Sequence, residues 1–341
     1  MNERIIFPAE WYPQSAVQLT WPHAQTDWAP ILDEVTDCFV SIAQEIVKRE
    51  KLLIVCVDEA EVRRRLGKTN YDRIIFREME TNDTWARDHG GITVLRNGKP
   101  TVYDFVFNGW GMRFAANYDN LITRVLAQTN TFNKDADVVN MQPIVLEGGS
   151  LESDGKGTLL TTVECLASVN RNEYLNKEQL EYHLKDLFGL ERVLWIENGY
   201  LAGDDTDSHI DTLARFCDER TIAYIQCTDK NDEHFEELQA MEMELKTFRT
   251  NDEKPYQLIP LPMADKVIWE GERLPATYAN FLIINGAVLL PFYLSDKDQI
   301  AQKALQKTFP DREIIGIDCR ALIKQHGSLH CATMQYPEGV I

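Results

Sequence analysis

Close to the C-terminal end of this 341-residue chain, one cysteine stands in a setting that favours reactivity. Cys331 ends the run Gly327-Ser328-Leu329-His330-Cys331, so it follows a Gly-Ser turn and an imidazole. A thiol acts as a nucleophile where nearby positive charge or backbone dipoles favour its thiolate. Other cysteines, such as Cys56 and Cys227, belong to apolar runs that are typical of a core. A cysteine after a turn is more often structural, so the interpretation of Cys331 as a nucleophile depends on partner residues elsewhere in the chain.

Candidate partners stand in three short motifs. His209 and Asp211 are two residues apart in the acidic segment 204–211, and residues at i and i+2 of an extended strand point to the same side. Asp88 ends the run Trp85-Ala86-Arg87-Asp88, and Glu147 begins Glu147-Gly148-Gly149-Ser150, both in turn-like sequences flanked by glycine. With the cysteine, they supply a candidate nucleophile, an imidazole that can transfer protons near neutral pH and three carboxylates.

The composition narrows the choice of partner. The formal net charge is −19 and the sequence pI is about 4.8, and such a surface repels a phosphate backbone or an anionic membrane. A small cationic substrate would be attracted, although much of the acidity is explained by solubility alone. Hydrophobic residues make up 44% of the chain, which is enough for a full core. We therefore expect no nucleic-acid partner and no membrane partner, and the sequence leaves self-association open.

The N-terminal residues and the cysteines indicate a cytoplasmic protein. Residues 1–8 lack the long apolar core of a signal peptide, and no run of 18 apolar residues occurs in the chain. The seven cysteines are odd in number and contain no C-x-x-C pair. This pattern fits reduced thiols better than a disulfide framework or a zinc ribbon.

Hydrophobic periodicity predicts alternating strands and helices. Between residues 31 and 46 the apolar positions recur at three- and four-residue steps, which is typical of an amphipathic helix. Residues 9–28 contain three tryptophans and two prolines, so a loop is expected there. The expected helices are 31–46, 59–66, 177–188, 233–247 and 296–308. The expected strands are 52–57, 73–79, 100–107, 138–147, 157–163, 192–197, 221–227, 257–260, 281–284, 287–292 and 314–318.

This order of elements favours an α/β fold with a mixed sheet pattern. Hairpins alternate with single helices, and Asn285-Gly286 between two apolar runs is a strong hairpin signal. Neither common type of Gly-rich nucleotide loop is present. We interpret the pattern as repeated ββαβ-like units. Since no Pro/Ser-rich linker divides the chain, we expect one domain over residues 1–341.

The motifs together resemble those of the agmatine deiminases, in the bacterial peptidylarginine-deiminase-related branch of the guanidine-modifying enzymes. The resemblance covers nearly the whole chain and rests on the Trp-Pro opening, Trp85-x-Arg87-Asp88, Phe107-Asn108-x-Trp110-Gly111, Glu147-Gly148-Gly149-Ser150, His209-x-Asp211, residues 277–281, residues 309–312 and His330-Cys331. Two loops depart from the pattern. Residues 327–331 replace Gly-Gly-Asn-Ile-His-Cys, and Asp88-His89-Gly90 replaces Asp-Thr-Gly, but neither change removes a chemical group.

The resemblance implies a fold and an activity. The fold would be a five-bladed α/β propeller, or pentein, with pseudo-fivefold symmetry around one central site. The activity would be that of a hydrolase acting on C–N bonds of amidines, which deiminates agmatine to N-carbamoylputrescine and ammonia in putrescine biosynthesis. It would need no cofactor and no metal.

The resemblance also implies a role for each motif residue. Asp88 and Asp211 would grip the flat guanidinium in paired hydrogen bonds. Cys331 would attack the guanidinium carbon and form an amidino-thioether. His209 would protonate the leaving amine and later activate water, and Glu147 would orient its imidazole.

Three further residues are candidates for substrate binding. Trp85 and Trp110 could line the guanidinium slot through cation–π contact, although core packing explains each equally well. Asp205 could meet the distal amine of agmatine, and an exposed loop charge is the alternative for that residue.

Several other functions remain to be weighed. The same core could deiminate arginine or peptidyl-arginine to citrulline, or transfer the amidino group to an amine. A metal-binding protein would use His326, His330 and Cys331, but Gly327 disfavours a shared helical face and no fourth ligand is evident. A non-catalytic binding protein is disfavoured because the catalytic set is intact.

Overall fold

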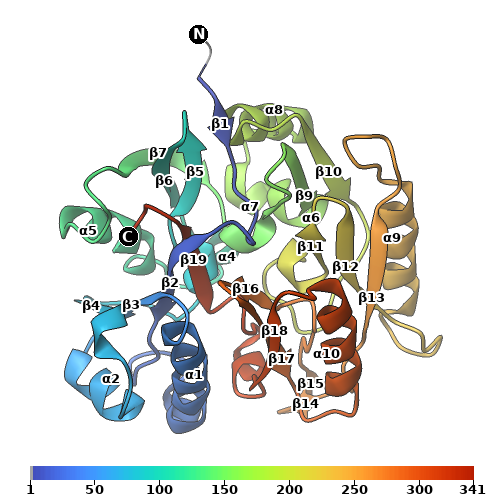
Figure 1. The fold of residues 1–341 in the computed structure, drawn as a ribbon. Helices are drawn as coiled ribbons and strands as arrows, with labels where there is room; N and C mark the ends of the chain where they lie inside the picture. Colours follow the sequence, from blue (N-terminus) through green and yellow to red (C-terminus); the bar gives the residue numbers. More distant parts are fainter. Residues whose placement is uncertain (1–2) are drawn as a thin grey trace.

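The computed structural model describes residues 3–341, and these residues form a mixed α/β fold of several small sheets (Figure 1). Five sheets have three or four strands, and a sixth consists of two short strands. In order across each sheet the strands are β19 (Thr333–Pro337), β2 (Gln14–Thr20), β3 (Lys51–Cys56) and β4 (Ile74–Glu78); β1 (Ile5–Ile6), β5 (Ile92–Arg96), β6 (Lys99–Val106) and β7 (Asp137–Val145); β10 (Arg192–Ile196), β9 (Thr158–Thr162) and β8 (Glu152–Ser153); β11 (Ala214–Asp218), β12 (Thr221–Gln226) and β13 (Gln257–Pro262); β16 (Leu282–Ile284), β17 (Ala287–Phe292) and β18 (Glu313–Asp318); and β14 (Ile268–Trp269) with β15 (Glu272–Arg273).

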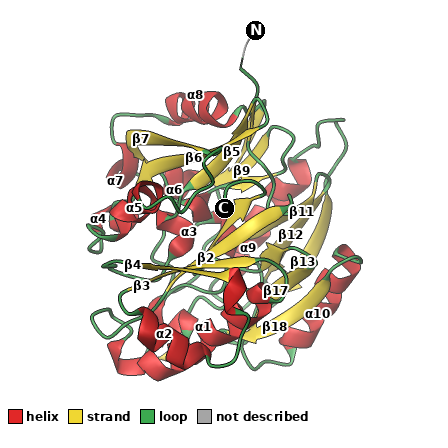
Figure 2. Ribbon diagram, turned by 60° about the vertical axis from the view of Figure 1, so that its left-hand side comes forward, coloured by secondary structure: helices red, strands yellow, loops and turns green. Residues whose placement is uncertain are grey.

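The helices differ widely in length. The longer ones are α1 (Leu32–Val47), α2 (Glu59–Leu66), α5 (Ile122–Gln128), α8 (Lys177–Phe188), α9 (Phe235–Thr247) and α10 (Lys297–Thr308). The single-turn helices are α3 (Ala86–His89), α4 (Gly109–Met112), α6 (Val163–Leu166) and α7 (Val169–Asn172). Figure 1 shows the longer helices spread around the outside, with the strands between them, and Figure 2 shows the same arrangement from another side.

The five larger sheets share one pairing pattern. In each, an antiparallel pair is extended by a parallel strand, as in β16, β17 and β18. A parallel neighbour requires a crossover connection, and α10 makes that connection between β17 and β18. The turn between β16 and β17 contains Gly286 at φ +74°, a conformation that favours glycine. The expectation of repeated ββαβ-like units therefore agrees with the observed strand pairing.

Local sequence signals explain the predicted helices. In α1 the apolar positions Val35, Phe39, Ile42 and Ile46 are all buried, which confirms the helix predicted over residues 31–46. α8 begins with a capping box between Asn176 and Gln179 and ends at Gly189 in the left-handed conformation. The apolar spacing and the capping residues of a helix lie within a short stretch of chain, so the sequence alone indicates these helices.

The loop predicted over residues 9–28 is wrong in its middle part, because β2 lies there. β2 is parallel to β3 and antiparallel to β19, with Leu19 opposite Thr333. Pro13 and Pro22 exclude a helix, but they flank the strand and remove no backbone donor from it. The strands β5, β8, β11 and β19 and helix α5 were also not predicted, since each is short and depends on packing with distant segments.

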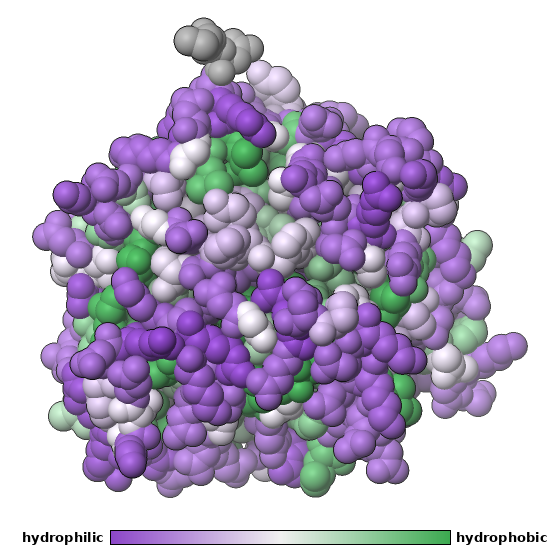
Figure 3. All heavy atoms as spheres, in the orientation of Figure 1, coloured by the Kyte–Doolittle hydropathy of each residue, from purple (hydrophilic) through white to green (hydrophobic). Residues whose placement is uncertain are grey.

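Apolar residues fill the space between helices and sheets, and the outer surface is mainly polar. The face shown in Figure 3 is largely hydrophilic, with apolar residues in small groups. Among residues 3–341, no helix combines the length and apolar character needed to cross a membrane.

Candidate active site

Five predicted residues from distant parts of the chain meet in the interior. Asp88 is on α3, Glu147 follows β7, and Cys331 precedes β19. Asp211 belongs to a single 3-10 turn, and His209 is the residue before that turn. Their exposed fractions are 5% for Cys331, 3% for Asp88, 1% for Glu147 and 0% for His209 and Asp211. The fold therefore brings together the whole set that the motifs predicted.

The backbone from His209 to Asp211 does not form an extended strand, so the expectation that strand geometry puts both side chains on one side does not apply. Residues Ile210–Thr212 form a 3-10 turn, for which His209 is the preceding residue. The two side chains still converge, because an added Cβ at Gly149 would lie 2.5 Å from His209 Nδ1 and 3.3 Å from Asp211 Oδ2. The same added atom would lie 2.8 Å from Asp88 Oδ1. Gly149 is therefore required by the close approach of these three groups.

His209 is held between two carboxylates. Its Nε2 lies 2.7 Å from Glu147 Oε2 and its Nδ1 lies 3.5 Å from Asp88 Oδ1. Burial alone would lower the pKa of His209, but the charges of Asp88 and the hydrogen bond to Glu147 help to raise that pKa well above its usual value. The imidazole is therefore favoured in its charged form, which can donate a proton.

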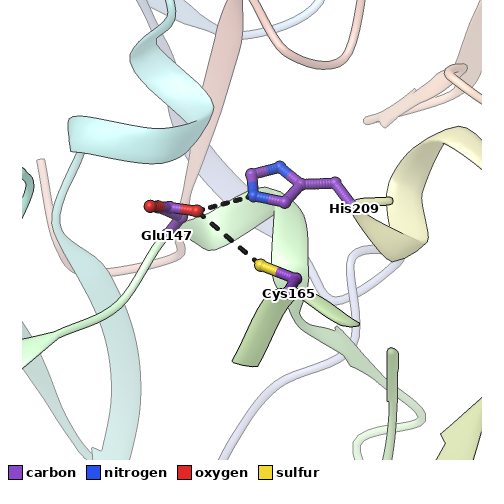
Figure 4. A group of neighbouring side chains, drawn as sticks. All are labelled: Glu147, Cys165 and His209. Atoms are coloured by element: carbon purple, nitrogen blue, oxygen red, sulfur yellow. Dashed lines mark hydrogen bonds and ion pairs between the residues drawn. The ribbon is translucent and has the colours of Figure 1, made fainter. Parts of the chain in front are cut away.

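Glu147 has two further partners that sequence reasoning missed. Arg171 donates to both carboxylate oxygens, at 3.1 and 3.0 Å, and Cys165 Sγ lies 3.8 Å from Oε2. Figure 4 shows the contacts of Glu147 with both His209 and Cys165 as dashed lines. Burial would raise the pKa of Glu147, but His209 and Arg171 outweigh this effect and lower it. Glu147 therefore remains an anion that can hold the imidazole in place.

Asp88 is fixed by two donors. Its Oδ2 accepts a hydrogen bond of 2.9 Å from Trp110 Nε1, and its Oδ1 accepts one of 2.9 Å from the backbone N–H of Gly149. Burial raises the pKa of Asp88 to about 6, although the neighbouring His209 opposes that change. Trp110 thus does more than pack, since its indole orients a carboxylate of the site.

Cys331 is a buried thiol beside acids and an amide. Its Sγ lies 3.3 Å from Asn280 Nδ2 and 3.7 Å from Asp211 Oδ2. Burial and the charges of Asp211 and Asp88 raise the pKa of Cys331 well above its usual value. The thiol is therefore neutral in the free protein, and a cation placed between the two carboxylates would favour the thiolate.

A buried chain of hydrogen-bonded side chains holds Asp211 in place. Its Oδ2 lies 2.7 Å from His330 Nδ1, and His330 Nε2 lies 2.7 Å from Glu10 Oε2. Glu10 also accepts a hydrogen bond of 2.8 Å from Arg215 Nη2. Burial would raise the pKa of Asp211, but His330 outweighs it and lowers that pKa. Asp211 is therefore an oriented anion beside the thiol.

Sequence reasoning gave no role to several of these supporting residues. Asn280 lies in the quoted motif 277–281, and its Oδ1 accepts hydrogen bonds from the backbone N–H groups of His330 and Cys331. The motif could have directed attention to Asn280. No signal in the sequence connected Glu10 or Arg171 to the site, because each is far along the chain from its partner.

The thiol opens into a cavity of about 120 Å³. Its lining includes Asp83, Trp85, Asp88, Trp110, Asp205 and Cys331. Trp85 packs its ring against Gly327, where an added Cβ would lie 2.4 Å from the indole. Both tryptophans predicted for substrate binding thus line the cavity that reaches Cys331.

Of the three neighbouring acids Asp204, Asp205 and Asp207, only Asp205 lines the cavity. Asp204 accepts hydrogen bonds within its own loop, including one of 2.7 Å from the backbone N–H of Ser208. Asp207 forms ion pairs with Arg113 and Arg171. Asp204 and Asp207 therefore stabilise the loop, and Asp205 is left to face the cavity.

One group of potential metal ligands occurs in the described part of the chain. Glu147, Cys165 and His209 offer ligand atoms within 4.8 Å of one another. Both oxygens of Glu147 already accept hydrogen bonds from Arg171, so a cation would compete with a buried guanidinium. The alternative ligand set His326, His330 and Cys331 does not form such a group within residues 3–341.

The raised pKa of Cys331 predicts how the free protein reacts with an alkylating reagent. We expect iodoacetamide to modify Cys331 slowly near pH 7 and ever faster up to about pH 10, because the thiolate appears only as the pH rises through a raised pKa. Mass spectrometry of the peptide that contains Cys331 measures the rate, and a Cys331→Ala variant corrects for the other cysteines. A rate that is already constant near neutral pH would show a preformed thiolate and contradict this expectation.

Comparison with known proteins agrees with this site. Residues 6–337 match the sequence profile of the family described as Porphyromonas-type peptidyl-arginine deiminase. An agmatine deiminase from C. jejuni, solved with substrate bound, is 37% identical with a TM-score of 0.94, and the match covers 100% of this chain and 98% of that one. A solved protein from Porphyromonas gingivalis, provisionally named an arginine deiminase, is 56% identical with a TM-score of 0.96, covering 99% and 100%. A provisionally named agmatine deiminase from Vibrio parahaemolyticus is 33% identical over 355 residues, covering 97% and 96%.

Fold, site and relatives define a hydrolase that acts on the C–N bonds of amidines. More narrowly, the chain belongs to the Porphyromonas-type peptidyl-arginine deiminase family. Both conclusions confirm the resemblance drawn from the sequence motifs.

Proposed function

We propose that this protein deiminates agmatine, giving N-carbamoylputrescine and ammonia through an amidino-cysteine intermediate. The observation that carries the proposal is the placement of Cys331 beside Asp88 and Asp211 in a cavity that also has carboxylates elsewhere on its wall. Such a cavity suits a ligand with positive charge at both ends. The similar C. jejuni and Vibrio proteins, which are named agmatine deiminases, support this choice of substrate.

In the first half of the proposed reaction, the guanidinium binds between Asp88 and Asp211. Its positive charge lowers the cost of ionising Cys331, so the thiol releases its proton to solvent in the cavity and the sulfur attacks the guanidinium carbon. His209, charged at the start, donates a proton to the departing nitrogen. The C–N bond breaks, ammonia leaves, and the carbon remains bound to sulfur as a cationic amidino-thioether.

In the second half, His209 is neutral and accepts a proton from water. The oxygen adds to the amidino carbon as a hydroxyl group. The C–S bond then breaks, and the hydroxyl proton passes to the departing sulfur, so Cys331 returns to its thiol form while the carbon becomes the carbonyl of a substituted urea. Glu147 holds the imidazole during both proton transfers, and Arg171 holds Glu147. One water is consumed for each ammonia released.

We propose further that the five larger sheets are the five units of a pseudo-symmetric propeller, the pentein arrangement, within one domain over residues 1–341. The shared pairing pattern supports this assignment. The product of the reaction would serve as a precursor of putrescine in polyamine biosynthesis.

The choice of agmatine over arginine makes a quantitative prediction. Arginine would bring its carboxylate toward Asp205 and the other acids of the cavity, and a like-charge approach costs several kcal/mol when the groups are desolvated. We expect kcat/KM for agmatine to exceed that for free arginine by at least about tenfold, as measured by ammonia release. Asp205→Asn should narrow this gap by weakening agmatine.

Equal turnover of free arginine or of an internal arginine peptide would assign the protein to arginine deimination instead. The P. gingivalis protein provisionally named an arginine deiminase makes this the alternative to test. Citrulline formation distinguishes that outcome from agmatine turnover.

A further inference from the structure

Three carboxylates line the cavity away from Asp88, and their environments differ. Asp27 is exposed. The side chain of Asp205 is 41% exposed, and its Oδ2 lies 3.8 Å from His326 Nδ1. Asp83 is more enclosed than Asp27 and belongs to the segment that continues into Trp85 and Asp88. Solvent screens the exposed Asp27, and His326 lies beside Asp205, so Asp83 is placed to interact most strongly with a charged ligand.

The carboxylate of Asp83 is fixed through one of its two oxygens. Oδ1 accepts hydrogen bonds of 2.9 Å from Trp28 Nε1 and 2.7 Å from the backbone N–H of Thr84. Within residues 3–341, no hydrogen bond is made to Oδ2. One oxygen of an oriented carboxylate is thus free to accept a donor from the cavity.

The loop that carries Asp83 is itself held in place. The backbone N–H groups of Asn82 and Asp83 donate to the two oxygens of Asp119, at 2.7 and 2.9 Å. Asp119 is 1% exposed. A carboxylate on a fixed loop loses little conformational freedom when it binds a ligand, which favours its use in recognition.

Asp83 also lacks a positive partner in the described chain. No Lys, Arg or His side chain lies within ion-pair distance of it among residues 3–341. Burial, with the nearby charge of Asp27, raises the pKa of Asp83 to about 6. A ligand cation would supply the missing charge and favour the ionised form.

The cavity that Asp83 and Cys331 line also has aromatic side chains in its wall. Trp85 lines the cavity and lies next to Trp28, with 5.6 Å between the ring centroids, and Phe114 lines it as well. Methylene groups fit such a wall, whereas a second carboxylate would meet the acids. The lining therefore matches a guanidinium, an apolar linker and a second cation.

We propose that Asp83 binds the distal primary ammonium of the substrate and is the main residue that selects for it. This inference rests on the proposed function and names a residue that the motif comparison left without a role. Asp205 contributes less, because its Oδ2 already lies 3.8 Å from His326 Nδ1.

The test compares two substrates that differ only in the second charge. Agmatine and n-butylguanidine share the guanidinium and a four-carbon chain, but only agmatine carries the ammonium. We expect the wild-type protein to prefer agmatine by at least about tenfold in kcat/KM. Asp83→Asn, which keeps an acceptor for Trp28 and Thr84, should lower kcat/KM for agmatine by at least about tenfold, mostly through KM, and leave n-butylguanidine within about threefold.

A matched control removes a remote acid. Asp33→Asn, at a side chain that is 91% exposed on α1, should leave both substrates within about threefold. Equal losses for both substrates in Asp83→Asn, or a wild-type preference below about threefold, would overturn the role of Asp83. The preference of the wild-type protein for agmatine is measured without a variant, so this measurement can contradict the proposal even if Asp83→Asn does not fold. Wild-type protein that hydrolyses neither compound would instead refute the proposed function.

Discussion

Cys331→Ala is expected to abolish hydrolysis of agmatine while the protein still binds the guanidinium. In the proposed mechanism the covalent step needs the sulfur, whereas the carboxylates of Asp88 and Asp211 hold the ligand, and the substitution leaves them in place. The site is also relieved of a buried thiol between two acids, so the fold should tolerate alanine. Ammonia release measures turnover, and calorimetric titration with agmatine measures binding.

A buried cysteine outside the site provides the control for Cys331→Ala. Cys227 is 7% exposed at the end of β12, and Cys227→Ala should retain turnover. A second experiment looks for the intermediate itself, since His209→Ala mixed with agmatine should accumulate the amidino adduct on Cys331, detectable by mass spectrometry. Full activity in Cys331→Ala would refute the covalent mechanism.

Asp88→Asn and Asp211→Asn should each lower kcat/KM by orders of magnitude. Asparagine keeps the shape of the side chain but removes the charge that pairs with the guanidinium, at a cost of about 2–5 kcal/mol for a buried contact. This corresponds to a loss of roughly thirtyfold to several thousandfold. In the Asp88→Asn variant the new amide NH2 group can also point at the indole N–H of Trp110. Two donors then face each other without an acceptor, which adds to the loss.

The two aspartate variants need a check on folding and a comparison with a neutral site. Thermal unfolding and circular dichroism should match the wild type, and Asp33→Asn serves again as the exposed control. A loss below about tenfold in a folded Asp88→Asn or Asp211→Asn protein would show that the residue does not grip the guanidinium.

The fold was predictable where the signal is local. Helix α1 is encoded by apolar positions three and four residues apart, and the hairpin of β16 and β17 by Asn285-Gly286. β2 was missed because its partner β19 lies at the other end of the chain, and no short-range pattern reports that pairing. Nor could the sequence show that Ile210–Thr212 is a 3-10 turn, since packing decides between an extended segment and a tight turn there.

The candidate site divides in the same way. The sequence by itself determined the candidate reacting groups, because Cys331, His209, Glu147 and the two aspartates proposed to grip the guanidinium stand in motifs with recognisable spacing. Only the tertiary structure decided how these groups behave. Burial and the nearby acids raise the pKa of Cys331, whereas the pKa of His209 is raised by its neighbours against the effect of burial, and both effects depend on atoms brought together from the whole chain.

The supporting residues and the acids that face the cavity were likewise decided by the tertiary structure. Asn280 contacts Cys331 from 51 positions away along the chain, and Arg171 contacts Glu147 from 24 positions away. Glu10 contacts His330, 320 positions away, which in turn contacts Asp211. Among neighbouring acids, Asp205 lines the cavity while Asp207 pairs with arginines, although both stand in one acidic run. The physical reason is that a charge acts through its distance to other charges and to water, and the fold sets both distances.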